Sequence, residues 1–249
     1  MSSHTNLKGT QMKNLLAPGA VALATLTAGA VFAEPGVPPL IYGVQVEQLE
    51  YRLGENDEDV LVWDFDAMVG NDELRLVFRS EAEMETSSND FETLENQLRL
   101  QMPISTFFDA VVGAHASTPT EGPNRYNLVV GVKGLAPQWF EIDADLYLSE
   151  YPFGRFEAEY EALLTNRLIL TPSLEVNMPF KDDIEAGQAA GGATIEIGAR
   201  LSYDLVGRAI SPYVGVNYEK SFGGTADLIE AAGGQSDNLS FVVGTRLFF

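Results

Sequence analysis

The sequence contains no cysteine, and this absence excludes several kinds of chemistry. Disulfide frameworks, thiolate catalysis and cysteine-based zinc, iron–sulfur or soft copper sites all require thiols. Histidine is almost as scarce, because only His4 and His115 occur in 249 residues. Two histidines cannot build a metal centre held by several imidazoles. A metal that binds this chain must therefore take most of its ligands from oxygen.

Basic residues are also few compared with acidic ones. The chain has 15 lysines and arginines against 36 aspartates and glutamates, which gives a formal net charge of −21. Nucleic acid is excluded as a partner because a chain of this charge repels phosphate. Apolar residues make up 45% of the chain, enough for a folded domain. The 23 glycines and nine tyrosines are typical of a protein rich in strands rather than helices.

The first 33 residues have the order of a secretory signal peptide. Lys8 and Lys13 precede a mostly apolar stretch that ends at Ala33, and no acidic residue occurs among them. A basic region, an apolar region and a small residue at the cleavage point are the three parts of such a peptide. A membrane anchor is the alternative, and Pro18 and Gly19 within the apolar stretch argue against it.

Cleavage after Ala33 divides the chain into three parts. Residues 1–33 are the expected signal peptide, residues 34–41 a short periplasmic segment, and residues 42–249 the folded domain. Removal of the two lysines leaves 13 basic and 36 acidic residues, a net charge of −23. Export from the cytoplasm is the first functional expectation.

Beyond residue 33 no stretch of 18 residues is apolar throughout, so a helical membrane span is excluded there. Apolar and polar residues alternate instead with a period of two, which indicates half-buried strands. Leu61, Trp63 and Phe65 share one face of their strand, for example, whereas Asp64 and Asp66 share the other. Twelve such segments follow one another: 42–53, 58–69, 73–85, 92–102, 106–116, 125–134, 139–149, 153–164, 167–178, 193–205, 211–221 and 238–249.

Alternation also fits a soluble β-sandwich, but three features favour a membrane barrel. Tight turns interleave with longer connections at 117–124, 179–192 and 222–237, as periplasmic turns and outer loops do in bacterial barrels. Aromatic residues gather near strand ends, where two girdles would lie. The last strand is apolar and ends in Phe249, as outer-membrane proteins do for insertion. The sequence therefore predicts an all-β fold, a transmembrane up-and-down antiparallel β-barrel of about 12 strands.

The two faces of each strand have different expected environments. A charged side chain in the middle of the bilayer costs roughly 2–4 kcal/mol, so the apolar faces should point to lipid and the charged faces to the lumen. Crowded carboxylates stay ionised only where guanidinium groups or cations neutralise them. We therefore expect a lumen that attracts cations and is partly plugged by pairs of arginine and carboxylate.

Five stretches of the chain carry a resemblance to a known family. They are LEYR (49–52), WDFDAMVGNDELRLVFRSEAE (63–83), GLAPQWFEIDADLYL (134–148), EAEYEALLTNRLILTPSLEVN (157–177) and SPYVGVNYEKSFGGTADL (211–228). These stretches resemble the barrel domain of copper resistance protein B, and the resemblance extends from about Tyr42 to Phe249. It implies a protein of copper tolerance and homeostasis in the outer membrane of a Gram-negative cell, with copper as the bound ion.

One departure from that family concerns the soft copper ligands. Members often carry a segment rich in methionine and histidine ahead of the barrel, and thioether and imidazole groups suit copper. Residues 34–41 of this chain contain neither methionine nor histidine. Three of the four methionines beyond residue 33 are expected on lipid faces. Only Met68 and His115 are expected to point inward, and they come from different strands.

Candidate metal contacts are therefore the inward-facing donors of the barrel. They are His115, Met68, Asp64, Asp66, Glu81 and Glu83. Imidazole nitrogen and carboxylate oxygen are ligands that suit Cu(II). Each group also has a structural interpretation, either as a histidine hydrogen-bonded to carboxylates or as part of a solvated wall paired with arginine. The residues alone leave both interpretations open.

An outer-membrane enzyme and a general cation pore are the two alternatives to copper handling. An outer-membrane lipase is disfavoured because no GxSxG motif occurs and His115 is expected to face inward. A protease that uses aspartate and histidine at the mouth of the lumen is less easily dismissed, because many carboxylates surround His115, but we expect no enzyme. A cation-selective pore without a dedicated copper site is the stronger alternative, since acidic rings attract any cation. The leading hypothesis is a monomeric barrel that binds or conducts copper ions through its acidic lumen, with outer-membrane lipid and copper or other cations as partners.

Overall fold

The computed structural model of the protein describes residues 39–54 and 59–249. These residues contain thirteen strand segments, one α-helix and two 3-10 turns. The elements are β1 (Ile41–Leu53), β2 (Val60–Gly70), β3 (Arg75–Glu85), β4 (Phe91–Pro103), β5 (Phe108–Ser117), β6 (Arg125–Ala136), η2 (Pro137–Trp139), β7 (Phe140–Leu148), β8 (Phe153–Glu159), β9 (Ala162–Leu163), β10 (Leu168–Pro179), η3 (Ile184–Ala186), β11 (Ala193–Tyr203), β12 (Ile210–Phe222), α1 (Gly223–Ala231) and β13 (Asp237–Phe248). The expected signal peptide and most of the 34–41 segment lie outside the described residues.

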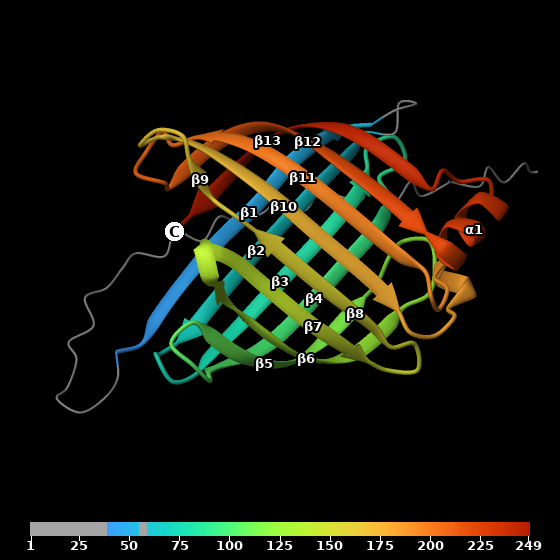
Figure 1. Ribbon diagram of the computed structural model, residues 1–249, viewed down its shortest axis with the longest axis horizontal. Coiled ribbons are helices and arrows are strands. Elements are labelled where there is room, and N and C mark those ends of the chain that lie inside the picture. Colours follow the sequence, from blue (N-terminus) through green and yellow to red (C-terminus); the bar gives the residue numbers. More distant parts are fainter. Residues whose placement is uncertain (1–38, 55–58) are drawn as a thin grey trace, which may run out of the picture. The chain divides into compact units, whose positions relative to one another are not determined.

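The strands form a closed antiparallel barrel (Figure 1). Each strand pairs with the next along the chain, except that β8 pairs with β10, and β1 pairs with β13 to close the sheet. The two-residue β9 continues β8, because both pair with β10 in one unbroken register. Between them Tyr160 donates its N–H to the carbonyl of Pro172 at 3.1 Å, but Pro172 has no N–H to donate in return. With β8 and β9 counted as one strand, the predicted twelve-stranded barrel is confirmed.

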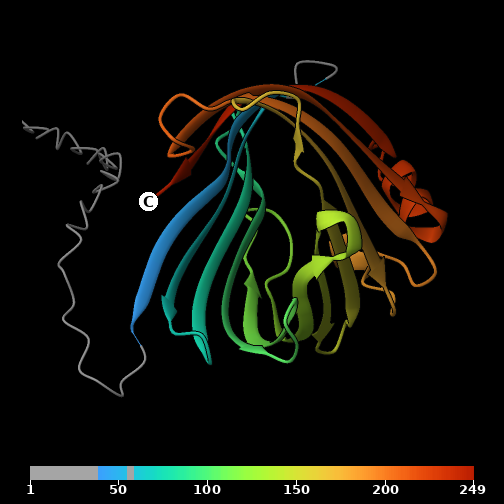
Figure 2. The same cartoon turned by 60° about the vertical axis from the view of Figure 1, so that its left-hand side comes forward.

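The two ends of the barrel carry different connections (Figure 2). Short turns join β2 to β3, β4 to β5, β6 to β7 and β9 to β10 at the end where the last strand finishes. The long connections 180–192 and 223–236, the second of which contains α1, lie at the other end. We call these the turn end and the loop end. No helix in the described part of the chain is long and apolar enough to cross a membrane.

Side chains alternate between the outside and the lumen. On β4, Leu98 and Met102 on the outside are 52% and 44% exposed, whereas Gln97 and Arg99 on the inside are 1% and 0% exposed. Large apolar side chains thus cover the outer surface while polar and charged ones are buried within. A water-soluble domain has the reverse arrangement. Lipid around the barrel favours apolar side chains on the outside and polar ones inside. The inward orientation of His115 and of the acidic strand faces, predicted from the register, agrees with the structure.

Some lumen positions are glycine because a neighbouring charged or polar side chain occupies the space that a Cβ atom would take. On β6, a Cβ atom at Gly131 would overlap the carboxylate of Asp145 and the carbonyl oxygen of Ala144. On β13, Gly244 leaves similar room for the ring of Tyr213. These polar side chains can therefore lie close against the inner wall.

We predict that Gly131→Ala lowers the free energy of unfolding by about 1–3 kcal/mol, because the added methyl group overpacks a site that cannot move without shifting the sheet. Urea unfolding of the refolded barrel measures the change. The matched control is Gly43→Ala, whose Cβ would lie 3.6 Å from the Phe249 carbonyl oxygen and 3.9 Å from the Met68 methyl carbon, an ordinary contact distance. Equal unfolding of both variants would contradict this account of Gly131.

Candidate cation-binding lumen

The barrel interior contains two main cavities, of about 680 and 540 Å³. The larger one reaches Trp139 and Leu163 near the short turns, and we call it the turn-end cavity. The smaller one reaches residues 183–188 of a long loop, and we call it the loop-end cavity. Five residues line both cavities and therefore mark the junction between them: Gln48, Asp64, Glu81, Glu175 and Glu196.

Carboxylates dominate the lining of both cavities. Ten aspartates and glutamates against three lysines and arginines line the turn-end cavity. Eleven acidic and three basic residues line the loop-end cavity. An enclosed space with low-dielectric walls strengthens the field of such an excess, which draws in cations and repels anions. The lumen therefore has the electrostatics of a cation-binding interior.

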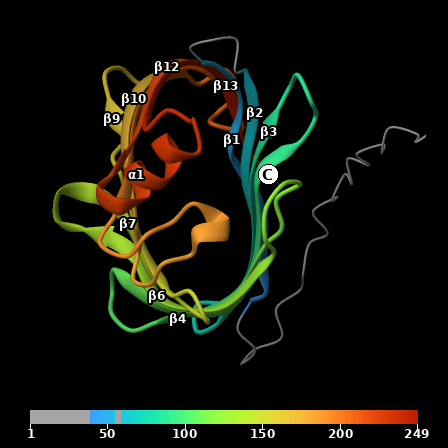
Figure 3. The same ribbon diagram turned by 90° about the vertical axis from the view of Figure 1, so that its right-hand side faces the viewer.

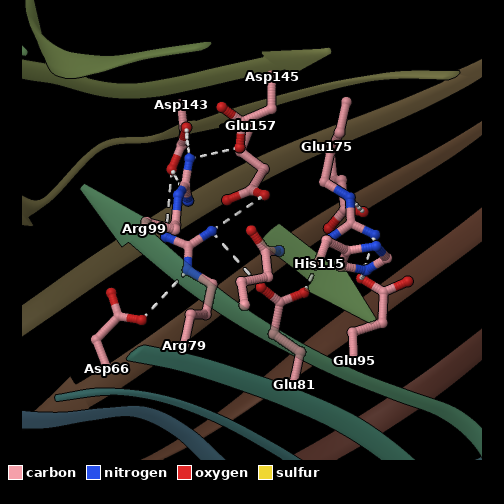
Figure 4. Close-up of polar contacts among 12 residues, drawn as sticks. Asp66, Arg79, Glu81, Glu95, Arg99, His115, Asp143, Asp145, Glu157 and Glu175 are labelled. Carbon is pink, nitrogen blue, oxygen red and sulfur yellow. Dashed lines mark hydrogen bonds and ion pairs between the residues drawn. The ribbon is translucent and has the colours of Figure 1, made fainter. Parts of the chain in front are cut away.

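Buried arginines hold the carboxylates of the turn-end half in place (Figure 4). Arg99 on β4 has no exposed side-chain surface and contacts Asp143 at 3.0 Å and Asp145 at 2.5 Å, both on β7. Arg79 on β3 reaches the same Asp143 at 3.3 Å and contacts Asp66 on β2, also at 3.3 Å. These contacts connect β2, β3 and β4 to β7 across the lumen. A network with several hydrogen bonds to each charge is the form in which buried ion pairs are tolerated.

A second arginine cluster lies at the junction of the cavities. Arg155 on β8 contacts Glu81 at 2.9 Å, Glu95 at 2.8 Å and Glu175 at 3.5 Å. Arg79 approaches the other oxygen of Glu81 at 3.5 Å. Glu81 therefore lies between two guanidinium groups, one on each side of the junction.

His115 on β5 lies in the wall of the loop-end cavity and is 3% exposed. Its Nδ1 atom is 2.9 Å from the side-chain nitrogen of Asn127, and its Nε2 atom is 3.2 Å from a carboxylate oxygen of Glu95. The ring also meets Tyr147 edge to face, with 4.9 Å between centroids. Both ring nitrogens face protein groups, so a metal ion at His115 would have to displace one of them.

Charged residues of β1 form a third group of buried ion pairs. Arg52 contacts Glu50 at 2.7 Å and Glu83 at 2.8 Å. Arg200 on β11 binds the same Glu50 at 2.9 Å, and the Tyr213 hydroxyl donates to it at 2.8 Å. Glu50 thus has three donors and is completely buried, with 1% of its surface exposed.

The structure does not bring the six candidate metal contacts into one site. Asp66 and Glu83 each have an arginine partner. Met68 lines a separate small cavity of about 280 Å³ at the turn end, away from His115. Among residues 39–54 and 59–249, no group of three or more histidine, aspartate or glutamate side chains is arranged to hold a metal ion.

Asp64 and Glu81 are the two candidates that the structure places together. They lie directly opposite each other on β2 and β3, where Cβ atoms are about 4.5–5.5 Å apart, and both line the two cavities. Oδ1 of Asp64 and Oε1 of Glu81 are enclosed and accept no hydrogen bond in the described part of the chain, and the Glu81 oxygen is 3.5 Å from a guanidinium nitrogen of Arg79. Asp64 also has no ion pair there. Two facing carboxylates supply oxygen ligands for a cation, and a cation there would share Glu81 with its arginine partners.

Three charged residues of β1 also face the lumen, although the sequence analysis does not single them out. Glu50 and Arg52 alternate with exposed apolar residues, so the period of two could have found them. Glu47 has no such signal, because the register shifts by one residue between Val46 and Gln48. This β-bulge adds Glu47 to the lining of the turn-end cavity.

The long loop 180–192 lies across the loop end of the barrel (Figure 3), and four of its residues line the loop-end cavity: Asp183, Glu185, Ala186 and Gln188. Arg125 at the start of β6 holds it with two hydrogen bonds to the Asp183 carboxylate, of 2.7 and 2.8 Å. The buried hydroxyl of Thr225 in α1 accepts a bond from the backbone N–H of Ala189 at 3.2 Å. The bonds from Arg125 also hold the pKa of the Asp183 carboxyl below its usual value. The loop is thus attached at both of its sides.

We predict that Arg99→Met lowers the free energy of unfolding by about 3–5 kcal/mol, because it leaves buried carboxylates without their partner. The control is Arg208→Met, which removes a contact of 3.2 Å to Glu161 from a side chain that is 54% exposed and should change stability by about 1 kcal/mol or less. Urea unfolding of both variants tests the comparison. A loss for Arg99→Met no larger than for the control would show that the central network does not support the barrel.

We also predict that acid releases the 180–192 loop. Because the folded pKa of Asp183 is lowered, its bond to Arg125 stabilises the loop above the unfolded pKa of about 3.9 and is lost as the pH falls through the folded value. A spin label at Ala190→Cys, in a chain without other cysteines, should become more mobile in that range. Asp183→Asn should give the mobile spectrum already at pH 7, and an immobile label in that variant would contradict the account.

Comparisons with known proteins match the chain to one family. The chain matches the family described as Copper resistance protein B precursor (CopB) over residues 40–249. It is 32% identical to Copper resistance protein B of Escherichia coli over 210 residues, which cover 84% of this chain and 69% of that protein. It is 33% identical to the Copper resistance protein B homolog of Pseudomonas syringae pv. tomato over 205 residues, 82% of this chain and 68% of the homolog.

Among solved structures, the NanC porin superposes with a TM-score of 0.53 at 13% identity, covering 83% of this chain and 99% of the porin. At that identity the likeness concerns the barrel fold alone. The family match, the two relatives and the closed barrel confirm the resemblance predicted from the sequence and the location in the outer membrane. The chain belongs to the copper resistance protein B family and is an outer-membrane β-barrel of that family.

Proposed function

We propose that this barrel serves copper resistance without catalysis, by drawing copper ions into its acidic lumen and binding them where the two cavities meet. The observation that carries the proposal is the pair of facing carboxylates at the junction, Asp64 and Glu81, since Asp64 has neither an ion pair nor a hydrogen bond to its enclosed Oδ1 in the described part of the chain. The excess of carboxylates over cations in both cavities supports it, because it concentrates cations around that pair.

The donors of the lumen favour Cu(II) over Cu(I). Carboxylate oxygen and imidazole nitrogen suit the divalent ion, whereas Cu(I) prefers thiolate and thioether sulfur. The chain has no cysteine, and Met68 lies in a different cavity from Asp64. His115 lines the loop-end cavity with Asp64 and Glu81, so it is an imidazole donor on the side from which an external ion would arrive, and the ion would have to displace Asn127 or Glu95 to bind it.

The arginines favour binding over free conduction. Arg155 and Arg79 both contact Glu81 at the junction, so an ion that crosses must pass two fixed positive charges. Asp64 is the carboxylate there without an arginine of its own in the described part of the chain. A copper ion held by Asp64 and Glu81 would compete with Arg155 and Arg79 for the second of these carboxylates.

A cation-selective lumen without copper specificity is the second candidate. It is favoured by the same acidic lining together with the lack of a three-ligand metal group in the described residues. The two functions differ in one measurable property, the preference for copper over a hard cation such as Ca²⁺, which carboxylates alone also bind.

We predict that the refolded barrel binds Cu²⁺ more tightly than Ca²⁺ or Zn²⁺ in calorimetric titrations, and that Asp64→Asn with Glu81→Gln weakens Cu²⁺ binding about tenfold or more. Loss of one hydrogen bond or contact to a charge is worth roughly 1.5–3 kcal/mol, and 1.4 kcal/mol corresponds to tenfold. The matched control is Glu73→Gln with Glu150→Gln, which removes the same charge from exposed positions outside the cavities. His115→Ala measures the contribution of the imidazole separately.

Two outcomes of these titrations would contradict the proposal. If Cu²⁺ binds no more tightly than Ca²⁺, the lumen is a general cation interior and the copper assignment fails. If the control pair weakens Cu²⁺ binding as much as the junction pair, the effect comes from the net charge of the protein rather than from Asp64 and Glu81.

A further inference from the structure

The lipid-facing surface of the barrel has a groove that the lumen chemistry does not use. Its volume is about 390 Å³, and it lies over β3 to β6, which are adjacent strands (Figure 1). We call it the β5 groove. Its outward-facing lining consists of Phe78, Asn96, Leu98, Ala114, Ala116 and Tyr126.

Small side chains on one strand create the groove. Ala114 on β5 lies between Leu98 on β4 and Leu128 on β6, and Ala116 lies between Asn96 and Tyr126. The two alanines form the floor, and the larger side chains of the neighbouring strands form its two sides. The groove is therefore about one strand wide and runs along β5.

Asn96 is an unusual residue for this surface. Its strand neighbours on the same face are apolar, yet its own amide has no hydrogen-bond partner in the described part of the chain. Ser80, directly opposite on β3, differs because the indole N–H of Trp63 donates to its hydroxyl at 3.4 Å. An unpartnered amide that faces hydrocarbon is costly, so a polar group of the surroundings should meet it.

The position of the groove along the barrel determines which leaflet of the bilayer it contacts. Ala116 is one residue from the end of β5, and Tyr126 is the second residue of β6, so this part of the groove lies at the loop end. In bacterial barrels the long loops face the outside of the cell. The groove therefore meets the outer leaflet, which in the outer membrane consists of lipid A carrying saccharide.

We propose that the β5 groove binds an acyl chain of lipid A. The chain would lie on Ala114 and Ala116 between the flanking side chains, continuous with the apolar surface that already contacts lipid. Lipid A carries amide and hydroxyl groups close to the head of its chains, and these both donate and accept hydrogen bonds, as the Asn96 amide does. The ester groups of a phospholipid accept only, so they would satisfy half of that amide.

Native mass spectrometry of the full chain in mild detergent tests this, with hexa-acylated lipid A and palmitoyl-oleoyl phosphatidylethanolamine as the two probes. We expect Ala114→Phe with Ala116→Phe to fill the groove and lower lipid A retention about tenfold. The control is Ala193→Phe with Ala199→Phe on the lipid face of β11, which should retain lipid A like the wild type. Asn96→Leu should lower retention of lipid A more than that of the phospholipid.

Gel mobility of the folded barrel, checked for every variant, separates a filled groove from a misfolded chain. Equal retention of lipid A by the groove variant and the wild type would overturn the proposal. Equal retention of both lipids by the wild type would show that the groove accepts any acyl chain. Loss of a dimer peak in the groove variant, with lipid A binding unchanged, would assign the groove to a second copy of the chain. Copper binding plays no part in these results, so they are independent of the function proposed for the lumen.

Discussion

The pairing of guanidinium groups with carboxylates inside the barrel is the interaction on which the rest of the structure depends. The outside of the strands faces hydrocarbon, so charged side chains of the spanning segments have to point inward. There they are stable only with partners, and Arg99 and Arg155, with little or no exposed surface, supply them to several strands at once. Arg155 contacts Glu81 and Glu175, two of the residues that line both cavities. Glycines such as Gly131 belong to this arrangement because they let the paired side chains lie against the wall.

The proposed cation binding depends on the lumen having more carboxylates than basic groups to pair with them. Both cavities have far more carboxylates than cationic groups, so part of the negative charge is left for ions from solution. Asp64 and Glu81 belong to this excess of carboxylates, and they face each other on the adjacent strands β2 and β3. A barrel in which every carboxylate had a basic partner would leave no oxygen for a cation, and one without arginines would be a wide acidic pore. The observed lumen lies between these two cases, because a few carboxylate oxygens at the junction lie close to arginines that an ion must pass.

The alternation of residues, together with the unequal connections, the aromatic strand ends and the apolar last strand, was sufficient to predict a barrel of twelve strands. The inward direction of the acidic faces followed, because lipid allows one orientation only. It could not place Glu47, since a bulge has no signature in the pattern. It also could not say which arginine meets which carboxylate, because partners such as Arg99 and Asp143 come from strands that are not neighbours. For the same reason it grouped Met68 with His115 as inward donors, although they line different cavities.

The central claim is that copper is held by the paired carboxylates at the junction of the cavities. Anomalous diffraction at the copper absorption edge, from crystals of the barrel soaked in Cu(II), tests it most directly. The account predicts a copper peak within coordination distance of oxygens from both Asp64 and Glu81, with the Arg155 side chain displaced from Glu81. A copper peak confined to the outer loops, with the junction unchanged and Arg155 still bound to Glu81, would contradict it.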